Sequence, residues 1–188
     1  AIRIGVFLEL IGVAGISFFA STEGGWAGIA PFLTVYGLGV GLATAQLTGV
    51  IMVDVPVEKT GQASGSQSTV RQIGSALGIA VLGTVLFTST QSAIETRVND
   101  LPSISAMPNA PKDFGKQLAD PVVETSGAVI PALEGKLSQV GVPANVAKDV
   151  VSAVEEGFTD GVKATGWAAA FFLLLGLGST FNLGSRKK

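Results

Sequence analysis

Residues 60–87 read TGQASGSQSTVRQIGSALGIAVLGTVLF, and this stretch decides how the chain folds. It is long enough to cross a bilayer, because about 20 mainly apolar residues in a helix span the hydrocarbon layer. Its only formal charge is Arg71, which lies about 11 residues from the start, roughly half-way across the layer at ~1.5 Å per residue. A charge at that depth is costly, so a function is predicted for it.

The composition indicates a membrane protein. Hydrophobic residues make up 47% of the chain and charged residues 14%, whereas soluble domains carry about 25% charged residues; the mean hydropathy is +0.53. The chain has no Cys and no His, which excludes disulfides, thiolate nucleophiles, His-based acid/base chemistry and the commonest zinc sites. Any proton chemistry therefore falls to carboxylates. The net charge of −2, with no stripe of bases, excludes nucleic acid as a partner.

Four apolar runs are long enough to span a bilayer, and they predict an all-α membrane protein with four transmembrane helices. The runs are residues 4–20, 29–53, 60–87 and 166–183. The chain is therefore expected to have three transmembrane helices in residues 1–89, a long extracytoplasmic loop in residues 90–165, and a last transmembrane helix with a basic cytoplasmic tail in residues 166–188.

Basic residues set the expected orientation. Arg3, Lys59 and the basic tail 186–188 fall on one side if the spans alternate, and the short turn 21–27 has no Lys or Arg. The positive-inside rule then predicts that both termini are cytoplasmic and that residues 90–165 lie outside the cell (plasma) membrane. The chain opens without a Met, and no signal-peptide cleavage site follows its first apolar run. We therefore expect a fragment or an internal start.

The outer loop is predicted to be partly helical. Prolines cut it into short pieces, so residues 101–112 are expected to be irregular and a short helix is expected over residues 131–140. Another helix, beginning at Pro143 and able to run into the fourth span, is expected where apolar residues recur every fourth position: Val146, Val150, Val154, Phe158 and Val162. This stripe either packs against other loop helices, lies on the lipid surface or contacts a partner.

Small residues mark the second and third spans as packing helices. Glycines at small-xxx-small spacing let another helix approach closely, and such contacts replace the hydrophobic driving force that lipid cannot supply. An alternative role is bending during transport. The candidate helix-packing residues are Gly37, Gly41, Gly49, Gly61, Gly65, Gly74, Gly78 and Gly83. The third span is therefore expected between other helices, whereas the bulky, uncharged fourth span is expected at the periphery.

Polar side chains inside the spans are the candidates for transport or gating. Arg71, with Gln72 beside it and Gln67 one turn earlier, either lines a water-filled path, pairs with a carboxylate in a gate, or tethers helices together. Nothing within its own span can neutralise Arg71. Gln46, in the middle of the second span, is a candidate for an amide that faces the substrate.

Two carboxylates are the candidates for proton-linked residues. Glu9 lies inside the first span, about 9 Å beyond Arg3 at ~1.5 Å per residue. A carboxylate in apolar surroundings can bind a proton and stay neutral. Asp54 closes the second span just before Pro56, so it either stabilises the helix end, contacts the loop, or takes part in coupling.

Residues 3–87 and the final span resemble a known transporter family, and an ordered series of motifs in the second and third spans carries the resemblance. They are similar to the C-terminal part of the fourteen-helix drug:proton antiporters (EmrB/QacA type) of the major facilitator superfamily. The matching motifs are GLGVG at 37–41, VP at 55–56, GQASG at 61–65, RQIG at 71–74, ALG at 76–78 and Gly83. Arg71 matches the Arg-Gln pair of the family, whereas Glu9 matches none of its motifs.

The resemblance implies a place in a larger protein and a function. The four spans would be helices eleven to fourteen of the family's bundle, with the first and fourth peripheral, the second lining the cavity and the third between the two halves. The implied activity is multidrug efflux of amphipathic or cationic small molecules in exchange for protons, by alternating access. The proton gradient is the energy source and no cofactor is implied. The lipid bilayer and the missing N-terminal helices are the implied partners, and the chain alone is not expected to transport.

A free-standing four-helix membrane scaffold, or an oligomeric pore whose outer cap binds a partner, is the alternative from a different class. A transporter fragment should expose the glycine-rich, polar face of its second and third spans, whereas a self-contained bundle should bury that face. An enzyme is not expected. The loop carboxylates are spaced like solvated helix faces, without a Gly-rich phosphate cradle, a serine nucleophile elbow or a metal cluster.

Overall fold

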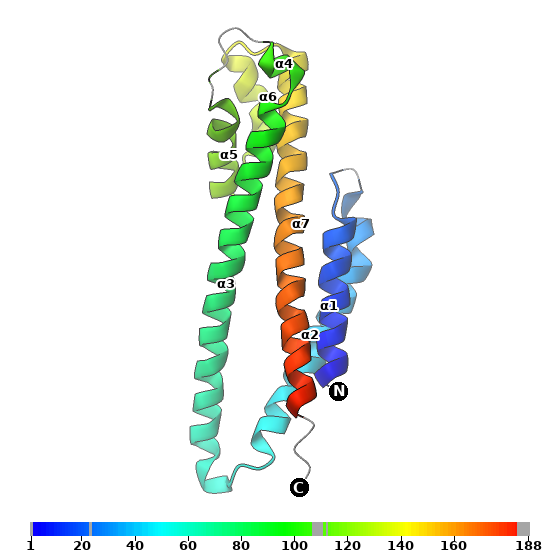
Figure 1. Ribbon diagram of the computed structural model, residues 1–188, viewed down its shortest axis with the longest axis vertical. Coiled ribbons are helices and arrows are strands. Elements are labelled where there is room, and N and C mark those ends of the chain that lie inside the picture. The colour runs from blue at the N-terminus through cyan, green and yellow to red at the C-terminus, as the bar shows by residue number, and fades with distance from the viewer. Residues whose placement is uncertain (1, 23, 107–110, 112, 184–188) are drawn as a thin grey trace. The chain divides into compact units, whose positions relative to one another are not determined.

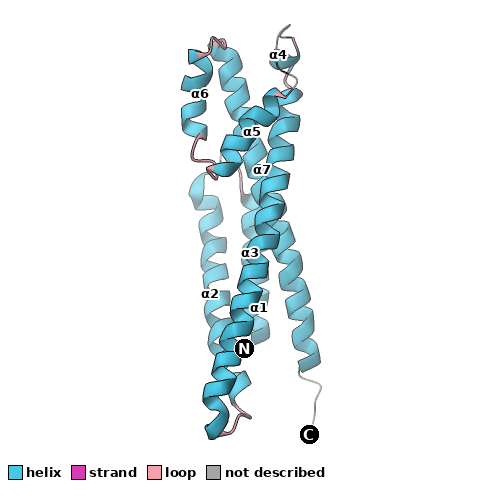
Figure 2. Ribbon diagram, turned by 90° about the vertical axis from the view of Figure 1, so that its left-hand side faces the viewer, coloured by secondary structure: helices cyan, strands magenta, loops and turns pink. Residues whose placement is uncertain are grey.

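The fold is helical. The computed structural model describes residues 2–22, 24–106, 111 and 113–183, and none of these residues lies in a strand (Figure 2). Four helices are long and apolar enough to cross a membrane: α1 (Ile2–Phe19), α2 (Gly25–Met52), α3 (Thr60–Asn99) and α7 (Ala144–Leu183) (Figure 1). The prediction of a helical protein with four candidate membrane spans is thus confirmed.

Two of these helices extend far beyond the apolar runs. α3 and α7 each contain 40 residues, about 60 Å of helix at ~1.5 Å per residue, or twice the ~30 Å hydrocarbon layer. Neither helix contains a proline, which would interrupt it. Pro102 follows the end of α3, and Pro143 precedes the start of α7. Hydropathy marks only the apolar part of each helix, so the runs 60–87 and 166–183 miss its polar continuation.

The contacts within the chain divide it into two compact units. The first unit comprises Ala1–Phe19, Trp26–Gly83 and Gly166–Lys188. The second unit comprises Ala20–Gly25 and Thr84–Thr165. α3 and α7 therefore contribute residues to both units.

Glycines bring α1 close to α2 in the first unit. A Cβ atom added at Gly5 would lie 2.6 Å from the backbone nitrogen of Ala43, and one added at Gly12 would lie 2.7 Å from the backbone nitrogen of Tyr36. On α2, a Cβ atom at Gly39 would lie 2.7 Å from the carbonyl oxygen of Gly5. Contacts this short with backbone atoms leave no space for a side chain, so only glycine permits the two helices to approach this closely.

The glycines singled out from the sequence are open in the structure. At all of them, an added Cβ atom would meet nothing within 4 Å among the described residues: Gly37, Gly41, Gly49, Gly61, Gly65, Gly74, Gly78 and Gly83. Of the open glycines, Gly74 and Gly78 of α3 line a cavity, whereas the others line neither of the two cavities of the first unit and are not covered by the described part of this chain. Their role in helix packing stays a prediction.

The second unit has a hydrophobic core of its own. Its short helices α4 (Pro102–Ser105), α5 (Phe114–Glu124) and α6 (Ile130–Gln139) bury apolar side chains together with parts of α3 and α7. The largest fully buried apolar side chains of this core are Ile94, Val98, Val122, Val150 and Val154. Burial at about 25 cal/mol per Å² of apolar surface makes this core the main stabilising term of the unit.

The loop elements mostly agree with the sequence predictions. α6 confirms the short helix expected over residues 131–140, and α7 confirms that the helix after Pro143 runs into the fourth apolar run. Val146 and Val154 belong to the buried core, so this part of the stripe packs against loop helices. The segment 101–112 was expected to be irregular, but α4 forms one turn within it; its residues 107–110 and 112 lie outside the described residues.

A second glycine seam joins α7 to α3 within the second unit. A Cβ atom added at Gly157 would lie 2.8 Å from the Cα atom of Ile94, and one added at Gly161 would lie 1.9 Å from Oγ1 of Thr90. The two glycines are four residues apart, which is the small-xxx-small spacing. The sequence prediction missed this pair because it lies in the long loop, outside the apolar runs. The seam sets the register of α7 against α3 in this unit.

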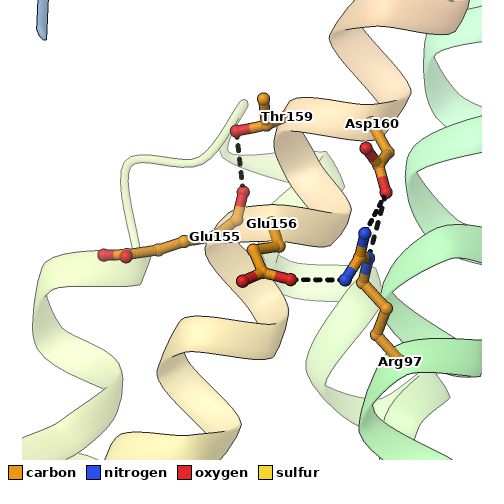
Figure 3. Close-up of polar contacts among 5 residues, drawn as sticks. All are labelled: Arg97, Glu155, Glu156, Thr159 and Asp160. Carbon is orange, nitrogen blue, oxygen red and sulfur yellow. Dashed lines mark hydrogen bonds and ion pairs between the residues drawn. The ribbon is translucent and has the colours of Figure 1, made fainter. Parts of the chain in front are cut away.

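Arg97 of α3 clamps the same pair of helices. Its Nε and Nη2 donate to Oδ2 of Asp160 at 3.0 and 2.7 Å, and its Nη1 pairs with the carboxylate of Glu156. Figure 3 shows the guanidinium between these two carboxylates, which lie one turn apart on α7. The hydrogen bond to Asp160 raises the pKa of Arg97 above its already high ordinary value, so the arginine stays charged at any usable pH and the clamp does not depend on its titration.

Removing the clamp is expected to destabilise the second unit modestly. Because Arg97 is 40% exposed, we expect Arg97→Ala to lower the free energy of unfolding by about 1 kcal/mol. Asp160→Asn should cost more than Glu156→Gln, since Asp160 accepts two hydrogen bonds from Arg97. Thermal unfolding by circular dichroism measures these differences. Lys136→Ala, an exposed base of the same unit, is the control, and an equal loss for Lys136 and Arg97 would contradict the clamp.

Candidate functional site

Two open cavities lie between the helices of the first unit, each lined by residues of α1, α2, α3 and α7. The larger has a volume of about 860 Å³ and the smaller a volume of about 480 Å³. Both lie within the range of about 300–1,000 Å³ that is typical of small-molecule sites. Glu9, Phe172 and Leu173 line both cavities, so the two are neighbours that share a wall.

The larger cavity brings together four of the residues singled out from the sequence. Arg71 and Gln67 reach it from α3, Gln46 from α2 and Glu9 from α1. Gln67 donates from Nε2 to Oγ1 of Thr48 at 3.2 Å, a hydrogen bond that links α3 to α2 beside the cavity. The sequence therefore identified a polar set that the fold gathers around one space.

Two other candidates lie elsewhere. Gln72 follows Arg71 directly, but it lines neither of these cavities because successive side chains of a helix point about 100° apart. Asp54 lies in the turn after α2 and also lines neither cavity. Their predicted roles in gating and coupling stay predictions.

Among the described residues, nothing pairs with the charge of Arg71. Its side chain is exposed in the first unit, and its guanidinium has no hydrogen-bond or ion-pair partner among the residues that the structure describes. An arginine cannot lose its proton in a protein, so at the depth of a hydrocarbon layer it requires water, a carboxylate or a ligand. The larger cavity is the space in which such a partner can reach it.

Glu9 is held at the shared wall by the contact between α1 and α2. A Cβ atom on Gly39 would lie 2.5 Å from the backbone nitrogen of Glu9 and 2.9 Å from its Cγ atom, so the glycine makes room for this residue. Within residues 2–22, 24–106, 111 and 113–183, the carboxylate of Glu9 has no hydrogen-bond or ion-pair partner. Among the described residues, Glu9 is therefore an acid without a partner, at the wall that the larger and the smaller cavity share.

Arg3, by contrast, has interaction partners on α7. Its Nη2 donates to the carbonyl oxygen of Thr180 at 3.1 Å, and its guanidinium carbon lies 4.6 Å from the centre of the Phe181 ring. The last carbonyls of a helix lack partners within the helix and attract cations. Arg3 therefore ties the start of α1 to the last turns of α7, although it also lines the larger cavity.

Several lining residues were missed by sequence reasoning. Tyr36 lines the smaller cavity, and Phe172 and Leu173 line both. α7 was expected to be peripheral because its apolar part is bulky and uncharged, but it supplies part of the shared wall. The run from Phe171 to Leu175 is apolar on every face, so no periodicity could reveal which side chains face a cavity.

Comparison with known proteins finds transporters. The chain is 44% identical over 63 residues to the multidrug resistance protein Stp of Mycobacterium tuberculosis, which is 34% of this chain and 12% of that protein. It is 36% identical over 72 residues to the probable actinorhodin transporter of Streptomyces coelicolor, 38% of this chain and 12% of the relative. It is 21% identical over 145 residues to the multidrug transporter protein MdtP of Bacillus subtilis, 77% of this chain and 26% of the relative.

These similarities cover only a part of each relative. The aligned segments span about an eighth of the first two proteins and 26% of the third. No family model matches the chain, and no solved structure matches it. Together with the four apolar helices, the similarity to named transporters points to a membrane-embedded, multi-pass protein with a role in transport.

Proposed function

We propose that this chain is the C-terminal part of a fourteen-helix multidrug efflux transporter of the major facilitator type. It exports amphipathic or cationic small molecules in exchange for protons by alternating access. Both termini lie in the cytoplasm, and residues 90–165 lie outside the plasma membrane. The missing N-terminal helices of the same transporter are its partners, and the proton gradient drives the exchange. Alone, the chain does not transport.

The observation that carries this proposal is that the described part of the chain leaves the apolar run of α3 uncovered at Gly61 and Gly65 and leaves Arg71 exposed. Gly61 and Gly65 meet nothing within 4 Å among the described residues and line neither cavity, and Arg71 on the same helix is exposed without a partner there. A self-contained bundle would bury such a face, because an arginine in contact with lipid is costly. A helix that packs against further helices of the same transporter would instead leave this surface exposed when those helices are absent.

The polar cavity supports the assignment of roles. Arg71, Gln67 and Gln46 belong to its polar lining and are the proposed transport and gating residues. Glu9 is the proposed proton-linked residue, because it is the acid of the described residues that borders both cavities. Binding of a proton or of a cationic drug to one carboxylate gives a physical basis for their exchange, since each neutralises the same charge.

A matched pair of experiments on Gly65 tests the proposal. Gly65 lines neither cavity, and an added Cβ atom meets nothing within 4 Å in the described structure. We expect Gly65→Leu to leave this chain folded in detergent, as measured by circular dichroism, but to lower drug efflux of the full-length transporter at least about tenfold, because the leucine blocks a close helix contact. Val70 is an exposed residue of the same helix. Val70→Leu is therefore the control, and it should leave efflux unchanged.

Three outcomes would contradict the proposal. Normal efflux by the Gly65→Leu transporter would show that this face is not an interface with other helices. Proton-coupled dye transport by this chain alone in vesicles would show that it is complete. A stable oligomer of this chain that Gly65→Leu dissociates would favour the alternative, a free-standing scaffold or oligomeric pore.

A further inference from the structure

The smaller cavity combines apolar walls with one acid. Among the described residues that line it, Glu9 is the charged one, and the other polar side chain is the hydroxyl-bearing Tyr36. The rest of its lining is aliphatic, aromatic or glycine, with Leu77, Val81 and Phe172 among the larger side chains. This chemistry suits a ligand with an apolar body and a single positive charge.

Phe172 lies where the two cavities meet. It lines both of them and is 49% exposed, so other residues do not cover it completely. Its neighbour Phe171 lines neither cavity, although the two rings contact each other edge to face with centroids 5.9 Å apart. The two residues therefore form a matched pair on one helix, one at the site and one away from it.

We propose that the smaller cavity is a subsite for the aromatic body of the ligand and that Phe172 of α7 determines its selectivity. This inference rests on the proposed drug transport. The positive charge of the ligand lies beside Glu9, and its ring stacks on Phe172 and Tyr36. Arg71 faces the larger cavity and repels a cation, so it keeps the charged end of the ligand at the shared wall.

Two physical terms set the selectivity. A ring that stacks on Phe172 gains an aromatic contact that an aliphatic group of the same charge does not make. A cation within about 6 Å of a ring face gains a further attraction. Loss of one such contact corresponds to a roughly three- to tenfold weaker affinity. The carboxylate of Glu9 attracts aromatic and aliphatic cations alike, so its contribution can be separated from that of the ring.

A matched pair of probes tests the subsite by binding. Tetraphenylphosphonium and tetrabutylphosphonium carry the same charge, but only the first is aromatic. We expect Phe172→Ala to weaken tetraphenylphosphonium binding to the purified protein about three- to tenfold and to leave tetrabutylphosphonium unchanged. Phe171→Ala should change neither, and Glu9→Gln should weaken both by a similar factor. Equal effects of Phe172→Ala and Phe171→Ala, or an equal loss of both probes in Phe172→Ala, would overturn the proposal.

Efflux by the full-length transporter separates this inference from the proposed function. If the wild type exports the phosphonium ions and Phe172→Ala selectively lowers the export of the aromatic one, both the proposed efflux and the aromatic subsite are supported. If the wild type exports them and Phe172→Ala behaves like Phe171→Ala, only the subsite falls. If the wild type exports neither while purified Phe172→Ala still loses aromatic binding, the subsite stands and the proposed efflux of such cations falls. Circular dichroism of each variant confirms that its helices are intact.

Discussion

Arg71→Ala is expected to lower drug efflux of the full-length transporter at least about tenfold without loss of membrane insertion. A hydrogen bond to a charged group contributes about 1.5–3 kcal/mol, which corresponds to a factor of about 10 to 150 in an equilibrium constant. Arg71 lines the larger cavity and has no partner among the described residues, so its interactions are free to form with water, a ligand or another helix during transport. Efflux of a fluorescent substrate from whole cells measures the loss.

Two further variants decide whether position or charge matters at this site. Arg71→Lys keeps the charge but loses the planar fork of donors, so we expect it to restore only part of the activity. Gln72→Ala removes the neighbouring polar group, which lines neither cavity, so it tests the gating role predicted for Gln72 apart from the cavity and should lower efflux less than Arg71→Ala. Normal drug resistance in both Arg71 variants would refute a gating or coupling role, and equal losses for Arg71→Ala and Gln72→Ala would show that the cavity is not what matters.

Gly39→Ala and Gly41→Ala are expected to change the stability of this chain in opposite directions. The added Cβ atom at Gly39 would lie 2.5 Å from the backbone nitrogen of Glu9 and 2.7 Å from the carbonyl oxygen of Gly5. Backbone atoms cannot move aside cheaply, so α1 and α2 have to separate, at a cost of about 1–3 kcal/mol. At Gly41 the Cβ atom meets nothing within 4 Å in the described structure, and alanine gains at most about 1 kcal/mol of helix propensity.

Unfolding of the purified chain in mixed detergent micelles, followed by circular dichroism, measures both changes. The Gly39 variant should also lose affinity for tetrabutylphosphonium, because the contact with Gly39 holds Glu9 at the wall of both cavities. Equal stability of the two variants would contradict the close approach of α1 and α2. In the full-length transporter, Gly41→Ala tests the open face of α2. If this variant lowers efflux of the transporter without lowering the stability of the isolated chain, another helix packs on that face of α2.

The sequence predicted the polar set of the site better than its walls. Arg71, Gln67 and Gln46 stand out because polar residues are rare in apolar runs, and they do line one cavity. Phe172 and Leu173 could not be singled out, because they belong to a run that is apolar on every face. A buried apolar wall and a surface that faces lipid have the same composition, so hydropathy does not separate them.

The prediction of glycine contacts shows the same limit. Small-xxx-small spacing is a local property, and it occurs both at Gly61 and Gly65, which are open here, and at Gly157 and Gly161, which pack against α3. Spacing identifies a face on which a helix can approach. It does not identify the helix that approaches, because that depends on which other faces compete for the same partner.

By itself, the sequence determined that this chain is helical, has four apolar helices long enough to span a membrane, and carries a charge deep within the third apolar run. Each of these follows from length, hydropathy and the cost of moving a charge into hydrocarbon, which are properties of one segment at a time. Only the tertiary structure decided that Glu9 and Arg71 share a cavity and that α7 forms part of its wall. It decided this because a cavity is made by faces of several helices, and the packing of glycines such as Gly39 sets how closely those faces approach.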